Sequence, residues 1–422
     1  MNTYLMQRPI STGSRNSLAT KIARARVRPF SLTIVAVIAA AAAFMGNSWA
    51  QPPASLEVAG GLPANAPGSS TITRTTDGRP QVRYLVVELG GRRANGMNES
   101  GGIVGNKNFA SGRHAAFWPS SQNSPVDLGT LSGLASVALS LNPAREIVGQ
   151  AFDPNSSIQR PVFWASPYST PVELPVLPAG LFGVAADINP SGQIVGRVFN
   201  EDFSVGRAVS WANSSAAPVN LPPLSNEFPY SEASNITASG KIFGGVCTAY
   251  FGVCRPAFWA NSASTPVTLA APGGEFINTN HAGLYGYPAH AINAAGNMVG
   301  FAANADDSAE RAVFWASSSS PAVILSTAGE FTNAIATAIN DKGQIAGIAW
   351  NEDFSKQRPF LWPTATSQGI DLTTFFPAGS NWNLDAMFAA DVNNRGEIIG
   401  SGSFQDGTIH NFALIPRHGR DE

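Results

Sequence analysis

Residue types that commonly carry out chemistry are sparse in this sequence. It holds five histidines, and none lies in a recognisable motif. There is no G-x-S-x-G nucleophile elbow, no H-E-x-x-H zinc motif, no P-loop and no dinucleotide-binding fingerprint. We therefore predict no catalytic residue and no cofactor, and we expect each histidine to be packed or solvated. They are His114, His281, His290, His410 and His418.

One polar residue recurs at a fixed place. An Arg precedes a Trp six times, and in five cases the separation is four residues, which places both on one side of a strand. A ring of such cations could bind an anion. Alternatively, each Arg pairs locally, because a half-buried guanidinium needs a bidentate partner. The six are Arg113, Arg160, Arg207, Arg255, Arg311 and Arg358.

Acidic and amide side chains gather in four short segments, 153–155, 200–202, 306–307 and 351–353. Calcium prefers clustered oxygens, but the spacings match no EF-hand. We expect ordinary solvated turns there, and we predict no metal site.

Two long connections between repeats combine aromatic and amide side chains, the kind of surface that recognises sugars or proteins. They predict a binding face at one rim of the fold. The alternative is that these aromatic rings pack on a neighbouring part of the chain. The candidates are Tyr285, Tyr287 and His290 in one connection, and Trp382 and Asn383 in the other.

Cys247 and Cys254 are the only cysteines. In an exported chain they are expected to form a disulfide that pins a hairpin, with free thiols as the alternative. Two sulfurs without a histidine cluster make a poor metal site.

These residues are set in a repeat of three elements. The first is Asn (once Thr) followed by Gly and an Ile-Val-Gly run, in seven copies spaced 44 to 56 residues apart. The second is Phe-Trp or a close variant, and the third is V-x-L. The first element begins at Asn98, Asn142, Asn189, Thr237, Asn293, Asn340 and Asn393, and the second ends at Trp118, Trp164, Trp211, Trp259, Trp315 and Trp362.

The repeat predicts four short antiparallel strands: the residues before the Asn, the Ile-Val-Gly run, the Phe-Trp run and V-x-L. The Asn and Gly between the first two strands are expected to tolerate left-handed backbone angles. The Trp residues are expected to form the core between repeats. Four strands in such a repeat are one propeller blade, so we predict an all-β, seven-bladed β-propeller.

The V-x-L element is missing from the last copy but occurs before the first, at Val87-Glu88-Leu89. We therefore expect the N-terminal strand to complete the last blade and close the ring. A β-solenoid or a pair of smaller sheets is the alternative.

The termini differ from the repeat. Residues 1–50 contain six basic residues and no acid, then a short apolar run and Ser48-Trp49-Ala50, which predicts a secretory signal peptide, with an uncleaved anchor as the alternative. Residues 51–80 read as a flexible linker, 81–416 as the propeller and 417–422 as a tail.

Charge narrows the range of partners. The chain has 26 basic residues, six of them in the signal peptide, against 28 acidic residues, so the mature protein would carry a net charge of −8. That charge disfavours nucleic acid and anionic lipid as partners. We expect a monomer without a membrane span, secreted, periplasmic or at the cell surface.

The chain resembles the HAF-type extracellular repeat family. The resemblance rests on I-N-x-x-G-x-I-V-G, on the A-F-W element and on residues 127–133 (DLGTLSG), and covers residues 84–416. The tripeptide that names the family is not intact here. The resemblance implies export and a repeat fold, and it brings no catalytic residues.

These patterns predict a non-enzymatic, exported binding or interaction module whose ligand, a glycan or a protein, is not specified. The alternative is a carbohydrate-active or other hydrolytic propeller, which needs two carboxylates from different blades near the axis, without Arg partners. Fold alone does not decide between them.

Overall fold

The computed structural model describes residues 83–131, 134–152, 158–176, 182–200, 205–248, 254–273, 291–304 and 308–417. Within these ranges the protein is all-β, with one short 3-10 helix, η2 (Leu372–Phe375). No helix in the described part is long and apolar enough to cross a membrane. The predicted signal peptide, the linker and the tail after Arg417 lie outside the described residues.

Five of the sheets contain four antiparallel strands each, paired in chain order. They are β2 (Arg93–Met97), β3 (Ile103–Phe109), β4 (Gly112–Trp118) and β5 (Val126–Asp127); β6 (Ala135–Leu141), β7 (Ile147–Phe152), β8 (Gln159–Trp164) and β9 (Val172–Glu173); β10 (Phe182–Ile188), β11 (Ile194–Phe199), β12 (Gly206–Trp211) and β13 (Val219–Asn220); β14 (Tyr230–Ile236), β15 (Ile242–Cys247), β16 (Cys254–Trp259) and β17 (Val267–Thr268); β18 (Ala291–Ile292), β19 (Met298–Ala303), β20 (Glu310–Trp315) and β21 (Val323–Ile324).

The remaining strands form one eight-stranded sheet with two halves. One half is β22 (Phe331–Ile339), β23 (Ile345–Asn351), β24 (Gln357–Trp362) and β25 (Ile370–Asp371); the other is β26 (Trp382–Val392), β27 (Ile398–Phe404), β28 (Ile409–Arg417) and β1 (Arg83–Glu88). A single parallel pairing of Gln357 with Ala386 joins the halves. The N-terminal β1 pairs with β28 from Arg83 to Glu88.

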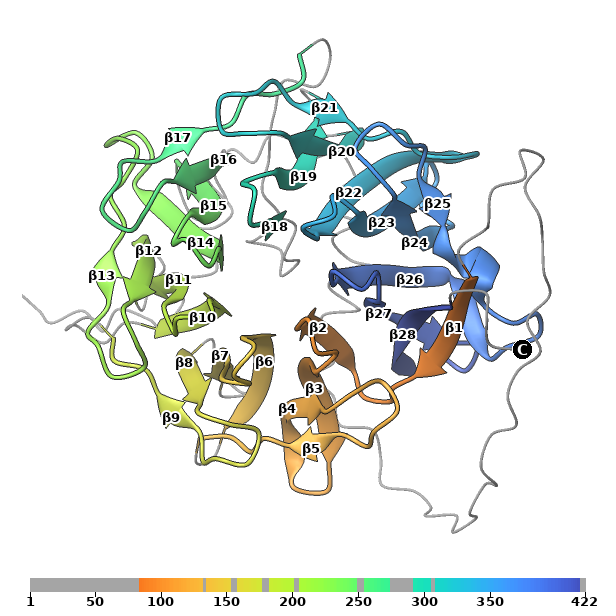
Figure 1. The fold of residues 1–422 in the computed structure, drawn as a ribbon, viewed down its shortest axis with the longest axis horizontal. Coiled ribbons are helices and arrows are strands. Elements are labelled where there is room, and N and C mark those ends of the chain that lie inside the picture. Colours follow the sequence, from red (N-terminus) through yellow and green to blue (C-terminus); the bar gives the residue numbers. More distant parts are fainter. Residues whose placement is uncertain are drawn as a thin grey trace, which may run out of the picture.

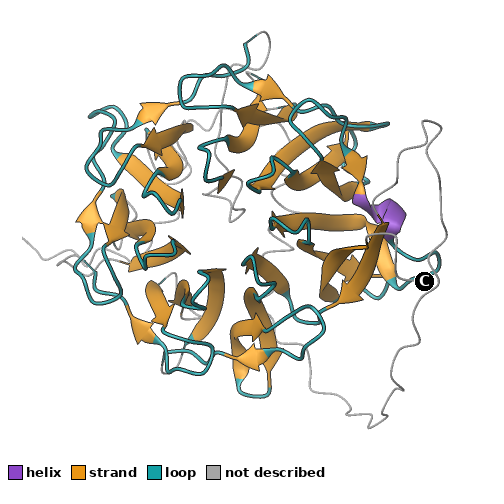
Figure 2. Ribbon diagram, in the orientation of Figure 1, coloured by secondary structure: helices purple, strands orange, loops and turns teal. Residues whose placement is uncertain are grey.

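The sheets stand around a common centre, as in a β-propeller (Figure 1). In each four-stranded unit the first strand lies nearest the centre and the fourth lies at the circumference. Figure 2 shows that strands dominate and that η2 lies beside β25 and β1. One end of every unit, the turn face, carries the turns between strands one and two and between strands three and four. The opposite end, the loop face, carries the loops between strands two and three and the connections between units.

The shape of the first strand of a unit leaves no room for a side chain at the Gly of the Ile-Val-Gly run in the second strand. The first strand bulges, as the register shift between Ala185 and Asp187 shows, and Gly196 pairs with the residue before the bulge. A Cβ on Gly196 would overlap the carbonyl oxygen of Val184. The same overlap would occur at Gly105, Gly149, Gly244, Gly347 and Gly400. The bulge and the Gly therefore form one unit of the repeat.

The Trp residues of the repeat form the core between units, which confirms the sequence prediction. All six are fully buried. Each indole N–H donates to a backbone carbonyl that follows the fourth strand of the preceding unit, at 2.7–3.1 Å, as Trp164 does to Leu128. The adjacent Phe163 faces the other way and packs with Ile188 and Ile194 of the next unit. Each Phe-Trp pair thus contacts both neighbouring units.

Leu89, just after β1, occupies the position that a Leu holds after each other fourth strand. It is buried, and its N–H donates to the carbonyl of Asn411 at 2.9 Å. Leu128, Leu174, Leu221, Leu269 and Leu325 donate to the third strand of their units in the same way. β1 therefore pairs with β28 as a fourth strand does.

The Asn of the repeat has a different role from the one predicted. Its backbone does not adopt a positive φ; the Gly three residues later does, as Gly192 shows, and in the second copy Arg145 takes that conformation with φ 64°. The Asn is buried instead, and its amide donates to the backbone carbonyl of the equivalent residue in the next unit, at 2.8–3.4 Å. The donors are Asn98, Asn142, Asn189, Asn293, Asn340 and Asn393, and the last donates back to Asn98.

Thr237 interrupts this chain of hydrogen bonds. It accepts from Asn189 and from the N–H of Lys241, but its side chain has no amide to donate to Asn293. The interruption lies between β14 and β18.

Candidate functional site

The loop face is the candidate site because its segments differ from one unit to the next. The β3–β4 loop occupies only residues 110–111, whereas the β23–β24 loop occupies 352–356. Variable loops on a rigid scaffold are where binding residues concentrate. The turn face, by contrast, repeats the same hydrogen bonds around the molecule.

The structure describes only some of the residues predicted to form a binding rim. Tyr285, Tyr287 and His290 lie outside the described residues and stay predictions. Trp382 opens β26 at the loop face but is only 6% exposed. Its ring makes edge contacts with Phe376, Phe404 and Phe412.

The exposure expected of Trp382 is therefore corrected: its ring belongs to the core, as in the packing alternative. Neighbouring Asn383 is half-buried, and its side chain accepts from the N–H of Asp385 at 3.3 Å. Sequence reasoning missed that the flanking aromatic residues of strands β27 and β28 would enclose this Trp.

Most of the repeated Arg residues have local partners, as the second interpretation proposed. Arg160 pairs with Glu173 at 2.9 Å, and Arg358 pairs with Asp371 at 2.8 Å and Asp385 at 2.6 Å. Arg207 donates to the carbonyl of Pro229, and Arg311 donates to the carbonyl of Glu310 at 3.1 Å. No ring of free cations results from these four.

Arg113 does not occupy the same position as the other five. In the five, the Arg pairs with the residue two after the repeat Gly, as Arg160 pairs with Ala151. In the first unit that place belongs to His114, which pairs with Lys107, while Arg113 pairs with Asn108. His114 also takes over the contact with the fourth strand, since its Nδ1 lies 3.0 Å from the carboxylate of Asp127.

Ser111, His114 and Asp127 form a Ser-His-Asp group, but not in the arrangement of a catalytic triad. A triad needs Ser on one ring nitrogen and Asp on the other. Here the Ser111 hydroxyl and the Asp127 carboxylate both approach Nδ1, at 3.3 Å and 3.0 Å, and Ser111 donates to Asp127 at 3.0 Å. The arrangement stabilises the β3–β4 hairpin and gives no activated nucleophile.

Two carboxyl groups occupy equivalent places on the innermost strands β10 and β26. Asp187 accepts from Ser140 at 2.5 Å and from the N–H of Ile236 at 2.8 Å, so it links three neighbouring first strands. Asp391 accepts from the N–H of Met97 at 2.8 Å and links β26 to β2. Each carboxylate is thus held by donors from an adjacent unit.

Both carboxyls bind protons more readily than usual. Desolvation by the surrounding protein raises the pKa of Asp187. Desolvation, with smaller contributions from the carboxylates of Asp187 and Glu99, raises the pKa of Asp391 to about 7, against the lowering effect of its N–H donors. No sequence motif marked either residue.

The acidic loops behave as turns where they are described. In the β23–β24 loop, Asn351 accepts from the N–H of Lys356 at 2.9 Å, and Asp353 accepts from the N–H and the hydroxyl of Ser355. Segments 153–155, 201–202 and 306–307 lie outside the described residues. In the described ranges, no three His, Cys, Asp or Glu side chains are arranged to hold a metal ion.

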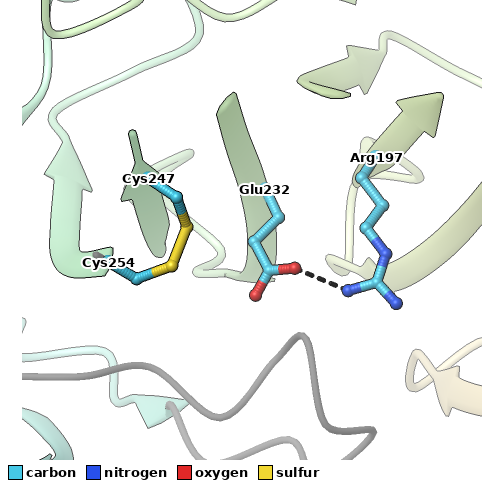
Figure 3. Close-up of a disulfide and its surroundings, with 4 residues drawn as sticks. All are labelled: Arg197, Glu232, Cys247 and Cys254. Atoms are coloured by element: carbon cyan, nitrogen blue, oxygen red, sulfur yellow. Dashed lines mark hydrogen bonds and ion pairs between the residues drawn. A yellow bond between two sulfur atoms is a disulfide. The ribbon is translucent and has the colours of Figure 1, made fainter. Parts of the chain in front are cut away.

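The predicted disulfide is present: Cys247 at the end of β15 is bonded to Cys254 at the start of β16. Figure 3 shows this bond near Glu232 and Arg197. Glu232 is buried and pairs with Arg197 across the interface between β14 and β11 at 2.6 Å. A covalent link and a buried ion pair therefore stabilise the loop-face end of this unit.

No protein-family model matches the chain, and no curated protein matches it. Among solved structures, it is similar to the β-propeller domain of the Trilobed protease from Pyrococcus furiosus, with TM-score 0.47, 8% identity, and coverage of 81% of this chain and 96% of that one. It is also similar to a xyloglucanase from Xanthomonas campestris, with TM-score 0.47, 10% identity, and coverage of 76% and 54%.

A third likeness is to a mutant of AofleA from Arthrobotrys oligospora, with TM-score 0.36, 8% identity, and coverage of 81% and 90%. At TM-scores below 0.5 these likenesses carry no argument about the ligand or activity of this chain.

Proposed function

We propose that this protein is an exported, seven-bladed β-propeller, a member of the HAF-type repeat family, that acts as a non-enzymatic binding module through its loop face. The blade count combines the five four-stranded sheets with the two halves of the eight-stranded one. The pairing of β1 with β28 supports a ring closed by the N-terminal strand. The disulfide is compatible with an oxidising compartment.

One observation carries the binding role: the contrast between the two faces. The turn face is built from hydrogen bonds repeated from unit to unit, whereas the loop face varies in length and residue type. Variable loops on a rigid scaffold are where binding residues, and catalytic residues, concentrate. The Ser111-His114-Asp127 group, whose hydroxyl and carboxylate share one ring nitrogen, gives the loop face no nucleophile.

The test is an array of glycans and secreted proteins probed with the purified protein and scored for binding and for turnover. Saturable binding without product supports the proposal. Replacing Tyr285 and Tyr287 by Ala should abolish that binding, whereas Tyr168→Ala, which removes an exposed ring at a turn-face hairpin, should not. Product release would overturn the proposal.

A hydrolytic function is the second candidate, favoured by Asp187 and Asp391 as carboxyls of raised pKa on different innermost strands. Asp391→Asn should then abolish any hydrolysis found on the array. Their hydrogen bonds to neighbouring backbone favour the structural role instead.

A further inference from the structure

The third strand of each unit carries a basic or imidazole side chain that pairs with the residue two after the repeat Gly. This residue is an Arg in five units. It is His114 in the first unit, paired with Lys107, and His410 on β28, paired with Gly402. Residues 89–92 join these two units by leading from β1 to β2. The exchange of Arg for His therefore occurs where the N-terminal strand meets the first unit.

His410 links the two ends of the repeat region. Its Nδ1 lies 2.8 Å from a carboxylate oxygen of Glu88 on β1, 322 residues earlier in the chain. The Arg160–Glu173 pair of the second unit has the same spacing, because in both pairs the residue opposite the acid lies two after the base. That pair joins strands that follow one another in the chain, whereas the contact between His410 and Glu88 fastens β1 to β28.

Both ring nitrogens of His410 face an acceptor. Nδ1 faces the Glu88 carboxylate, and Nε2 lies 3.0 Å from the hydroxyl oxygen of Thr408. A hydroxyl has one proton to donate, and Thr408 donates it to the carboxylate of Asp406 at 2.5 Å. Nε2 must therefore donate to Thr408, and only the protonated imidazolium carries a proton on both nitrogens.

Aromatic rings and acids surround His410. The ring of Phe404 on β27 is stacked on the imidazole with centroids 3.7 Å apart, and Trp382 on β26 makes an edge contact at 6.3 Å. In the described part of the chain, the charged groups that reach His410, directly or through the Thr hydroxyl, are Glu88 and Asp406. Hydrogen bonds from that Thr and, to a smaller extent, the charge of His410 lower the pKa of Asp406. An aromatic face and two acids favour a cation at this place.

A hydroxyl and a carboxylate on opposite ring nitrogens are also the connectivity of a hydrolase triad. In a triad, the hydroxyl gives its proton to the ring, whereas Thr408 gives its proton to Asp406. The group is therefore arranged to hold a charged ring and does not activate a nucleophile.

We propose that His410, held between Glu88 and Thr408, is a pH-sensitive bridge that fastens the N-terminal strand β1 to β28. Histidine is the side chain that ordinarily changes charge between about pH 5 and 8. In mildly acidic surroundings, the charged ring pairs with Glu88 and donates to Thr408. As the pH rises and the ring loses a proton, the ion pair is lost and Nε2 faces another acceptor, so β1 separates from β28 more often. His114 does not share this role, because both of its partners approach Nδ1 and neither requires a proton on Nε2.

The test is hydrogen–deuterium exchange of the purified protein at pH 5.5 and pH 8, with rates corrected for the intrinsic effect of pH. The strand β9, which is tied to its unit by the pH-independent Arg160–Glu173 pair, is the internal reference. The protection of β1 relative to β9 should fall by about threefold to fivefold from pH 5.5 to pH 8, which is the scale of one partly exposed ion pair.

His410→Gln should remove this pH dependence and leave β1 weakly protected at both values. His410→Arg, which places there the residue of the five other units, should keep β1 protected at both. Glu88→Gln should behave as His410→Gln does, and it keeps the test valid if loss of the imidazole from its stack on Phe404 disturbs β28. Arg160→Gln is the matched control and should leave the pH dependence of β1 unchanged. Equal protection of β1 at the two pH values in the native protein, or an unchanged pH dependence in both His410→Gln and Glu88→Gln, would overturn the inference.

Discussion

The two faces of the molecule are built by different rules. At the turn face, buried amides run from Asn98 through Asn142 to Asn189, and from Asn293 back to Asn98, so that every unit except the one that carries Thr237 donates to the next in the same way. The turns between strands three and four repeat a single bond as well, at 3.1–3.2 Å. At the loop face, different units use different means, such as an aromatic cluster around Trp382, a disulfide at Cys247 and an ion pair at Arg358.

This difference shows that the interactions that repeat from unit to unit and the residues that vary between units lie at opposite faces of the molecule. The repeated bonds of the turn face hold the units in register, which leaves the loop face free to change without loss of the fold. Changes at the turn face should therefore cost more than matched changes at the loop face.

The largest expected effect is that of pH. Because the folded pKa of Asp391 is about 7 against an ordinary 3.8, its protonated form stabilises the protein below pH 4, and this contribution is lost as the pH rises through 7. The loss is as much as about 4 kcal/mol. On the loop face, hydrogen bonds lower the pKa of Asp353 and Asp406. The stability that these two ionised carboxylates contribute is present at neutral pH and is lost only in acid, which is the opposite pH dependence.

Urea unfolding between pH 4 and pH 8 measures this dependence. Asp391→Asn should flatten the slope, whereas Asp353→Asn should leave it in place. A native protein that gains stability over this range would contradict the assignment.

Asn340→Ala tests the amide chain directly. It removes a buried amide that donates to Asn393 and to Gln344 and accepts from the N–H of Gln344. Unfolding in urea should show a loss of about 3 kcal/mol, since several buried groups lose their partners. The loop-face control Asn383→Ala should cost less than about 0.5 kcal/mol; equal costs would refute the separation of roles.

The disulfide tests how much the loop face contributes by local means. Replacing Cys247 and Cys254 together by Ser should cost about 2 kcal/mol, because the bond closes only a short loop. Thermal melting in the absence of reductant measures the effect. A loss larger than that of Asn340→Ala would reverse the order of the two faces.

Thr237→Asn should extend the amide chain toward Asn293. One added buried hydrogen bond predicts a gain of about 1 kcal/mol in the free energy of unfolding. Ser239→Asn, two residues away in the same turn, serves as the control and should have no such gain. A destabilised Thr237→Asn would show that the interruption is required by the packing of this unit.

Arg145→Gly should bring the smallest gain, about 0.5 kcal/mol. The left-handed backbone at Arg145 costs an L-residue about 1–2 kcal/mol, which Gly relieves, and the greater freedom of Gly in the unfolded chain offsets part of it. Gly192→Ala, at the equivalent position of the next unit, should have the opposite sign. Differential scanning calorimetry distinguishes the two.

The repeat by itself determined the four-stranded units, the burial of each Trp and the pairing of β1 with the last unit. These follow from local patterns: alternation along a strand, aromatic residues that must leave water, and a missing V-x-L that only the N-terminus supplies. The disulfide followed equally from having just two cysteines in a chain that the sequence predicts to be exported.

Only the tertiary structure decided the partners of the repeat Asn residues, the burial of Trp382 and the position of Arg113, because these features depend on contacts between strands or units that are separated in the chain. The amide of Asn393 bonds to Asn98, 295 residues away, and Trp382 is enclosed by Phe404 and Phe412 from later strands. The one-residue offset that exchanges Arg113 for His114 is visible only in strand register, because a shift of one residue turns a side chain to the other face of its sheet.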